Sequence, residues 1–165
     1  MHDSSAALLV RFRDKYLSRD TERRIADVGA FDGAETYKRA LEGFGHYVGI
    51  DMCPGNNVTV VHTQEYGWWY DVLRTEHAFD VTITGQTLEH VRAPWRWITD
   101  LKNITRPGGL IWICAPNTWD YHEVPIDCWR VWPEGMRALL DEGGLEVVEV
   151  GREGCDTFGI ARKPK

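Results

Sequence analysis

Two stretches of the chain decide its fold: Arg24-Ile25-Ala26-Asp27-Val28-Gly29-Ala30-Phe31-Asp32-Gly33 and Gly49-Ile50-Asp51. The apolar run that ends at Gly29 predicts a buried strand, and the loop containing Gly33 leads into a predicted helix from Ala34 to Leu41. A second apolar run begins at Tyr47 and ends on Asp51. In α/β folds an acid after the second strand accepts hydrogen bonds from both hydroxyls of a ribose, so the pattern predicts a nucleoside site.

Phe31 argues for a nucleoside that carries no diphosphate. In the pyrophosphate fingerprint G-x-G-x-x-G the second glycine lets the backbone approach the diphosphate, and Phe31 occupies that position here. A nicotinamide-dependent oxidoreductase is therefore disfavoured, whereas S-adenosylmethionine (SAM) offers a ribose without a diphosphate. The stretch resembles the first motif, D-x-G-x-G-x-G, of the class I SAM-dependent methyltransferases, which Asp27, Gly29 and Gly33 match.

This resemblance implies a set of cofactor-binding residues. Asp27 would orient the glycine loop and reach the ammonium group of SAM through water, Asp51 would bind the ribose hydroxyls, and Met52 would lie against the adenine. The loop residues whose backbone would face the amino-acid end of SAM are Gly29, Ala30, Phe31 and Gly33.

Recognition of the adenine amino group departs from the family pattern. Family members place an acid after the third strand, where this chain has His62-Thr63-Gln64-Glu65, with no acid directly at the strand end. Thr63 or Gln64 would then serve as a neutral hydrogen-bonding partner.

The segment Phe79 to Val91 resembles the fourth motif of the same family, in which an F-D-x-(apolar) strand leads to a loop ending in L-E-H. Since this strand lies beside the first strand in the family fold, Gly85 and Gln86 would border the methionine half of SAM. His90 is a candidate general base. It could equally brace the loop, and Glu89 is favoured at a helix start by the helix dipole.

A second reaction-site candidate follows the fifth predicted strand. Residues Pro116 to Arg130 resemble the P-N-x-x-x-x-H-x-x-P-x-D-x-W-R signature of a group of small bacterial methyltransferases. His122 is the first candidate for a general base, with Asp127 as its orienting partner. In the alternative interpretation, Asp127 forms an ion pair with Arg130 that folds the loop. The spacing of His122, Glu123 and Asp127 matches no recognised ligand pattern, so no metal site is predicted.

The predicted fold class is α/β, with a Rossmann-like, doubly wound, mostly parallel sheet of seven strands that ends in an antiparallel hairpin. Residues 1–165 are expected to form a single SAM-dependent methyltransferase domain, with an N-terminal helix in 1–20, capped by Asp3, Ser4 or Ser5, and the core in 21–165. The predicted strands are 24–28, 47–50, 58–61, 78–84, 110–114, 145–150 and 157–161, and 65–76 is a helix or an irregular lid.

Composition and charge limit which kinds of binding partner are expected. A net charge of −6 opposes a large nucleic-acid interface. Acids interrupt the basic residues between Arg11 and Arg24, which favours a solvated helix face over a phosphate-binding patch. The apolar run from Ala6 to Val10 is too short for a signal peptide or a membrane span, and the cysteines have no metal-like pairing. A cytoplasmic protein without membrane or nucleic-acid partners is therefore expected. Homo-oligomerisation stays open, because a second subunit could close the acceptor site.

The favoured function is methyl transfer from SAM to a hydroxyl or amine of a small acceptor, such as a sugar-like molecule or a secondary metabolite. Eight tryptophans give mild support to a ring-bearing or carbohydrate-like acceptor, although packing is their commoner role. Two alternatives stay open. One is a macromolecular acceptor at an open site, and the other is a non-catalytic scaffold or partner subunit that retains the nucleoside pocket.

Overall fold

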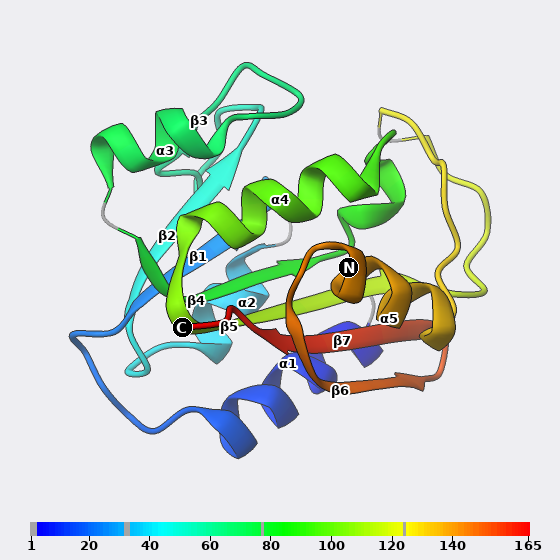
Figure 1. Cartoon of the computed structure of the whole chain (residues 1–165), viewed down its shortest axis with the longest axis horizontal. Coiled ribbons are helices and arrows are strands. Elements are labelled where there is room, and N and C mark those ends of the chain that lie inside the picture. Colours follow the sequence, from blue (N-terminus) through cyan, green and yellow to red (C-terminus); the bar gives the residue numbers. More distant parts are fainter. Residues whose placement is uncertain (1–2, 32–33, 77, 124) are drawn as a thin grey trace.

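The computed structural model describes residues 3–31, 34–76, 78–123 and 125–165 and contains one seven-stranded sheet with strand order β3-β2-β1-β4-β5-β7-β6. The strands β1 to β5 run parallel to one another, and β7 is antiparallel to both β5 and β6. The predicted doubly wound sheet with an antiparallel pair at its end is confirmed (Figure 1). The strands are β1 (Arg24–Val28), β2 (His46–Asp51), β3 (Val60–Val61), β4 (Phe79–Gly85), β5 (Thr105–Pro116), β6 (Glu146–Glu153) and β7 (Asp156–Arg162).

Helices cover both faces of the sheet and enclose two apolar cores (Figure 1). One core lies under α1 and α2, where Phe12 and Tyr37 pack with Trp112 of β5. The other lies under α3, α4 and α5 and includes Trp68 and Met136. Because alternate strand residues face opposite sides, a strand buried on both faces is nearly continuously apolar. The helices are α1 (Asp3–Tyr16), α2 (Ala34–Ala40), α3 (Trp69–Thr75), the 3₁₀ turn η1 (Leu88–His90), α4 (Pro94–Ile104) and α5 (Pro133–Glu142).

The sequence explains where α4 and α5 begin and end. Each has a proline in its first turn, where the missing N–H has no intrahelical partner to lose. On α4 the buried apolar residues Trp97, Ile98, Leu101 and Ile104 recur at helical spacing. After α5, Gly144 adopts a φ of +64°, a conformation that disfavours continuation of the helix by most other residues.

The bounds of β3 and β5 differ from the predicted ones in ways that hydrogen bonding and strand register describe. β3 contains only Val60–Val61. Before it, the N–H of Val58 bonds to the carbonyl of Gly55 in a turn, and the N–H of Thr59 bonds to the carbonyl of Gly49 on β2. β5 begins at Thr105, before the predicted start at residue 110. Pro107, Gly108 and Gly109 lie within this longer strand, where the pairing with β4 shifts register and Gly108 has a φ of +76°.

The predicted serine caps of the first helix are wrong. Ser4 and Ser5 both lie within α1, and their hydroxyls make contacts far along the chain. The Ser4 hydroxyl donates to Asp156, and the Ser5 hydroxyl bonds to the Tyr37 hydroxyl in the core beneath α1. These serines therefore attach α1 to β7 and α2.

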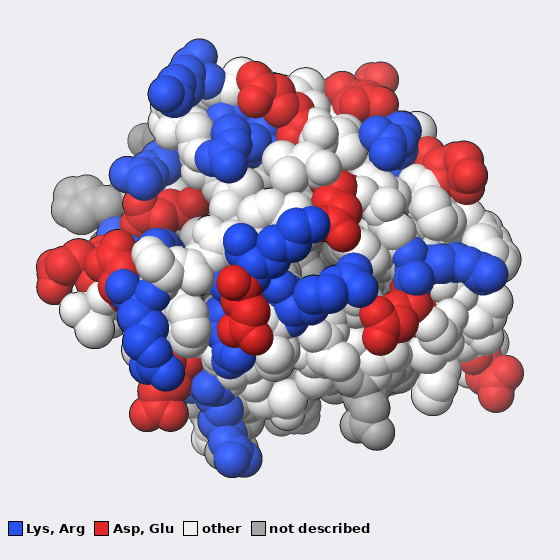
Figure 2. Space-filling view, turned by 90° about the horizontal axis from the view of Figure 1, so that it is seen from below, with Lys and Arg blue, Asp and Glu red and all other residues white. Residues whose placement is uncertain are grey.

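Charges of both signs are intermixed on the face seen from below (Figure 2). On α1, Arg11 pairs with Glu153 and Lys15 with Glu149, both on β6. This pairing supports the interpretation of the N-terminal basic residues as a solvated helix face. Within the described ranges, no helix combines the length and the apolarity that crossing a membrane requires.

Candidate active site at the carboxyl edge of the parallel strands

The strand order reverses between β1 and β4, and the carboxyl ends of both strands open at the same edge of the sheet. In open α/β sheets, ligands bind in the crevice outside this switch point. The candidate residues lie at the carboxyl ends of β1, β2 and β4 or in the loops after β1, β2, β3, β4 and β5, so the sheet brings together segments that are far apart in the sequence. Gly33, one of the predicted loop residues, lies outside the described residues.

The turn after β1 is tied to the turn after β4. Gly29 has a φ of +84°, and a Cβ at this position would lie 2.0 Å from Oγ1 of Thr87. The N–H groups of Gly29 and Ala30 donate to the carbonyl of Ile50 at 2.9 and 3.2 Å. Glycine is therefore required at position 29 both by the backbone conformation and by the close approach of Thr87.

Asp27 is a buried carboxylate at the end of β1. Its side chain is 1% exposed, and its Oδ2 accepts a hydrogen bond of 2.6 Å from the hydroxyl of Tyr47 on β2. Desolvation raises the pKa of Asp27 to about 7, against the opposing effect of the Tyr47 hydrogen bond. The carboxylate is thus close to half-ionised at neutral pH.

Asp51 joins the loops after β1 and β2. Its Oδ2 accepts the N–H of Phe31 and its Oδ1 accepts the N–H of Cys53, each at 2.9 Å. Each oxygen of a carboxylate has two lone pairs, so both retain one for a further donor. Met52 beside it is 52% exposed.

The side chain of Phe31 lies against the loop after β2. A Cβ built on Gly55 would be 3.1 Å from Cδ2 of Phe31, so the ring packs on this glycine. Phe31 is 40% exposed. Thr63 and Gln64, which follow β3, are also exposed, and the N–H of the preceding His62 donates to the carbonyl of Asp51. Phe31, Met52, Thr63 and Gln64 therefore belong to loops that are linked at this edge.

Gly85 and Gln86 close β4 in a constrained conformation. A Cβ on Gly85 would lie 2.1 Å from the hydroxyl of Tyr37, so α2 packs directly on this glycine. Among the described residues other than glycine, Gln86 alone has a positive φ, at 58°. Its amide donates to Oδ1 of the buried Asp156 at 3.0 Å. A left-handed non-glycine residue held by its side chain is a frequent feature of functional sites.

The loop after β5 is folded around an ion pair. Both terminal nitrogens of Arg130 donate to the carboxylate of Asp127, at 2.5 and 2.6 Å, and the same guanidinium donates to the carbonyls of Trp119 and Asp120. This guanidinium holds the pKa of Asp127 well below its usual range. The loop-folding interpretation of this pair is thereby supported.

Asp127 also contacts His122. Its Oδ2 accepts the backbone N–H of His122 at 2.7 Å and lies 3.4 Å from Nδ1 of the ring. Nδ1 of His122 is 3.0 Å from the carbonyl of Asp120. A ring nitrogen beside two acceptors carries the proton, so the lone pair of the neutral imidazole lies on Nε2. The carboxylate therefore braces the loop and orients the histidine at once.

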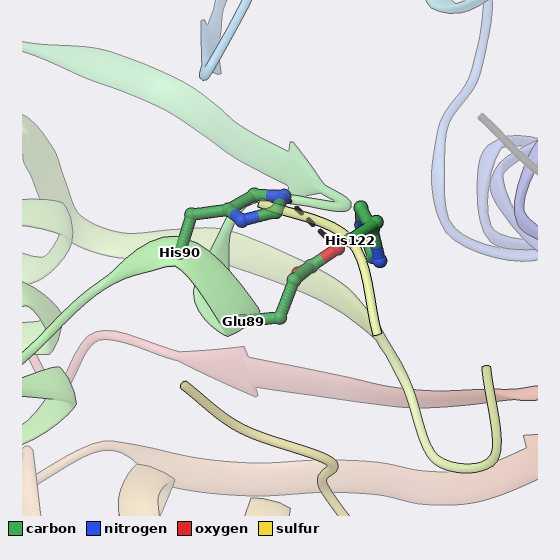
Figure 3. A group of neighbouring side chains, drawn as sticks. All are labelled: Glu89, His90 and His122. Atoms are coloured by element: carbon green, nitrogen blue, oxygen red, sulfur yellow. Dashed lines mark ion pairs between the residues drawn. The ribbon is translucent and has the colours of Figure 1, made fainter. Parts of the chain in front are cut away.

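Glu89, His90 and His122 meet although they come from two separate loops (Figure 3). The rings of His90 and His122 are perpendicular, with centroids 5.1 Å apart. Nε2 of His90 is 3.7 Å from Oε1 of Glu89, and Nδ1 of His90 contacts the carbonyl of Ile126. Glu89 lies in the short turn η1, where the sequence indicated a helix start.

Burial distinguishes Glu89 from a surface helix-start acid. Its side chain is fully buried, and neither carboxylate oxygen has a hydrogen-bond partner among the residues that the structure describes. Desolvation raises the pKa of Glu89 to about 8 and lowers the pKa of His90. A buried acid without hydrogen bonds is costly, so its retention calls for a functional explanation.

Comparison with known proteins identifies the family. The model of a family described as a methyltransferase domain matches residues 2–150. The chain belongs to this family. With its class I fold, it is a SAM-dependent methyltransferase, which confirms the cofactor and the enzyme class predicted from the sequence.

A curated relative supports the assignment of this methyltransferase. The ubiquinone biosynthesis O-methyltransferase of Maricaulis maris is 32% identical over 152 residues, which cover 75% of this chain and 59% of the relative. The corresponding protein of Dinoroseobacter shibae is 26% identical, over 76% of this chain and 61% of its own length. The chain thus spans about three fifths of the length of these two curated relatives.

Solved structures share the fold at low sequence identity. The methyltransferase in the complex with the Haloferax volcanii Trm112 activator has a TM-score of 0.71 at 14% identity, covering 99% of this chain and 90% of that one. The Burkholderia thailandensis 1,6-didemethyltoxoflavin N1-methyltransferase, solved with S-adenosylhomocysteine, has a TM-score of 0.69 at 14% identity, over 99% and 78%.

Sequence reasoning missed several residues of this edge. Tyr47 and Thr87 reach Asp27 and Gly29 across neighbouring strands, and Asp156 reaches Gln86 from the far end of the chain. An acid at the start of the final strand was the available signal for Asp156, because buried acids need partners. Nothing in the local sequence marked Tyr47 or Thr87.

Proposed function

We propose that this methyltransferase transfers the methyl group of SAM to the oxygen of a hydroxyl on a small, ring-bearing acceptor. The observation that carries the proposal is the meeting of His90, His122 and Glu89 at the edge that also holds the glycine turn and Asp51. An open nucleoside site and a set of proton-accepting groups thereby share one end of the sheet.

The geometry of the first two loops fits SAM. Both oxygens of Asp51 keep a lone pair for a ribose hydroxyl, and the exposed Met52 offers an apolar surface for a base. The Phe31 ring packs on Gly55, which supports access along the backbone of the turn. Asp27 would face the ammonium group of the methionine half, and Thr63 or Gln64 the adenine.

Gly85 and Gln86 are proposed to border the methyl group. SAM, when bound, supplies an activated methyl group on a sulfonium, so the protein needs chiefly to align the acceptor for in-line attack. The amide of Gln86, fixed by Asp156, gives this part of the site a rigid wall.

His122 is proposed as the general base. With its proton on Nδ1, held by Asp120 and Asp127, the ring offers Nε2 to the acceptor hydroxyl. The oxygen forms its bond to the methyl carbon as the carbon–sulfur bond breaks, and the hydroxyl proton passes to Nε2. The products are the methyl ether, S-adenosylhomocysteine and a protonated imidazole. His90 stands next to His122 as a second proton acceptor.

Exposed aromatic rings favour a ring-bearing acceptor. Trp119, Trp129 and Trp132 are 47%, 38% and 47% exposed on the loop that carries His122. The Trp129 indole donates to the carbonyl of Val91 and its ring lies 6.4 Å from that of Trp95, so this surface is ordered. Aromatic side chains stack well on planar rings. The curated relatives are named O-methyltransferases, which supports oxygen as the methylated atom.

An acceptor panel with methyl-labelled SAM tests the proposal. The panel contains a catechol, a simple phenol, an aniline and a sugar, and labelled product is identified by mass spectrometry. Label is expected in the catechol or the phenol. Transfer only to the aniline contradicts oxygen as the methylated atom, and transfer only to the sugar contradicts a planar ring in the acceptor. Label recovered in an added protein fraction instead would favour a macromolecular acceptor.

A further inference from the structure

The geometry points to a divalent transition-metal site formed by Glu89, His90 and His122, which deepens the proposed function and rests on it only for the role of the ion. One ligand atom from each residue lies within 4.8 Å of the other two (Figure 3). This set differs from His122, Glu123 and Asp127, whose spacing in the sequence matches no recognised ligand pattern.

The set weighed from the sequence is occupied by other interactions. The carboxylate of Asp127 is taken up by Arg130, and the Glu123 carboxylate accepts a hydrogen bond of 2.7 Å from the Tyr121 hydroxyl. The carboxylate that lies near both histidines is instead that of Glu89, which the spacing of residues in the sequence could not indicate.

Glu89 is the independent observation that calls for a ligand. Its carboxylate is fully buried and lacks a hydrogen-bond partner among the described residues, with Oε1 directed toward Nε2 of His90 (Figure 3). The separation of 3.7 Å is too long for a hydrogen bond. A tetrahedral ion with bonds of about 2.0–2.2 Å holds its ligand atoms roughly 3.3 Å apart, so small side-chain rotations bring these atoms to coordinating distance.

The two imidazoles are prepared as ligands. Nδ1 of His90 contacts the carbonyl of Ile126, and Nδ1 of His122 contacts the carbonyl of Asp120. Metal-binding histidines characteristically donate their other ring nitrogen to a carbonyl or carboxylate, which fixes the tautomer and frees the second nitrogen for the ion. Both histidines show this arrangement.

The nearby cationic charge is offset. The guanidinium of Arg130 acts on Glu89 electrostatically, and both of its terminal nitrogens bond to Asp127. The positive charge of Arg130 is therefore offset by the carboxylate of Asp127 when a cation binds near Glu89.

The ligand set selects the class of metal. Two imidazole nitrogens and one carboxylate suit Zn²⁺, Co²⁺, Mn²⁺ or Fe²⁺, whereas Mg²⁺ and Ca²⁺ prefer oxygen ligands. Three protein ligands leave coordination positions open. The His122 side chain is 32% exposed, so the site can be reached from solvent. In the loaded enzyme, the ion would bind the acceptor oxygen and lower the pKa of its hydroxyl, whose proton would then pass to water. His122 would act there as a metal ligand in place of the general-base role proposed above, because the single free lone pair on its Nε2 cannot serve both roles.

Metal titration of the untagged, chelator-treated chain tests the site without SAM or acceptor. Co²⁺ is added and followed by visible absorption, and Zn²⁺ by calorimetry. The variants are Glu89→Gln, which keeps the size of the side chain, and His122→Ala. His46→Ala is the matched control, because His46 is an exposed histidine at the start of β2.

We expect one ion per chain in the wild type and in His46→Ala. Affinity should fall by more than about 10- to 100-fold in Glu89→Gln and His122→Ala, because loss of a group that merely orients a ligand already has an effect of that size. Thermal unfolding of each metal-free variant reports its folding, and the ion should raise the midpoint only where it binds. Absence of binding to the folded wild type, or equal affinity in all four proteins, overturns the site.

Activity separates this inference from the proposed function. A metal-free enzyme that methylates a phenolic hydroxyl at the full rate leaves the proposed function intact and overturns the role of the ion. Specific metal binding by a chain that methylates no panel acceptor supports the site and contradicts the acceptor class.

Discussion

At the residue scale, the pKa of Asp27 should make SAM binding depend on pH. Burial raises its pKa to about 7, and a ligand ammonium nearby would favour the ionised carboxylate. Binding SAM should therefore release a proton below this pH. The affinity should rise with pH until about 7 and then level off, because above that value the carboxylate is already ionised.

Calorimetry with SAM in buffers of different ionisation enthalpy measures this proton release. Near pH 6 we expect a fractional proton to be released by the wild type. Asp27→Asn should bind more weakly and without this component. The same proton release in Asp27→Asn would assign the effect to another group.

Asp51 should contribute to affinity rather than to turnover of bound substrate. Replacing it with asparagine leaves its size unchanged but removes the charge that accepts the ribose hydroxyls. A hydrogen bond to a charged group contributes about 1.5–3 kcal/mol, so the Kd for SAM should rise by roughly 10- to 100-fold. Asp141→Asn, at an exposed position on α5, is the control. Equal Kd values for the two variants would contradict the ribose assignment.

At the element scale, the loop after β5 depends on Arg130. Arg130→Gln removes the paired bonds to Asp127 and weakens those to the carbonyls of Trp119 and Asp120. Amide exchange should accelerate in 117–123 and 125–131. Turnover should fall, while the Kd for SAM changes by less than about threefold, because the loops after β1 and β2 are untouched.

Arg137→Gln on α5 serves as the control for this loop, since Arg137 is exposed. Acceleration of exchange throughout the sheet in Arg130→Gln would indicate a general loss of stability. Unchanged exchange in the loop would show that the ion pair does not fold it.

Individual elements differ in how well the sequence predicted them. The strand from Arg24 to Val28 was predicted at its observed bounds, because its apolar run acts locally. The start of β5 was not, because the register shift against β4 accommodates Pro107 and the following glycines within a strand. Ser5 satisfied the pattern of a cap, yet its contact with Tyr37 depends on how α1 packs on α2.

At the scale of the whole molecule, strand order explains which parts of the site could be predicted. Motifs next to a strand end, such as Asp51 and Gln86, follow from the alternation of strands and helices. The contact between His90 and His122 depends instead on the path of a long loop, which carbonyl contacts of Arg130 determine. Neither local spacing nor strand order specifies such contacts.

At this scale, the sites proposed for the methyl donor and for the acceptor lie next to each other. The central claim is that the carboxyl edge of the parallel strands holds SAM on one side and an acceptor hydroxyl beside His122 on the other. The two functions should therefore be separable by mutation, with binding lost at Asp51 and transfer lost at His122.

Steady-state transfer of labelled methyl by His122→Ala, with Asp51→Asn and His46→Ala in parallel, tests this claim most directly. On the acceptor found by the panel, His122→Ala should keep the Kd for SAM within about twofold and lose roughly 10²- to 10⁴-fold in kcat, the usual contribution of a general base. His46→Ala should match the wild type. Wild-type kcat in His122→Ala would contradict the account.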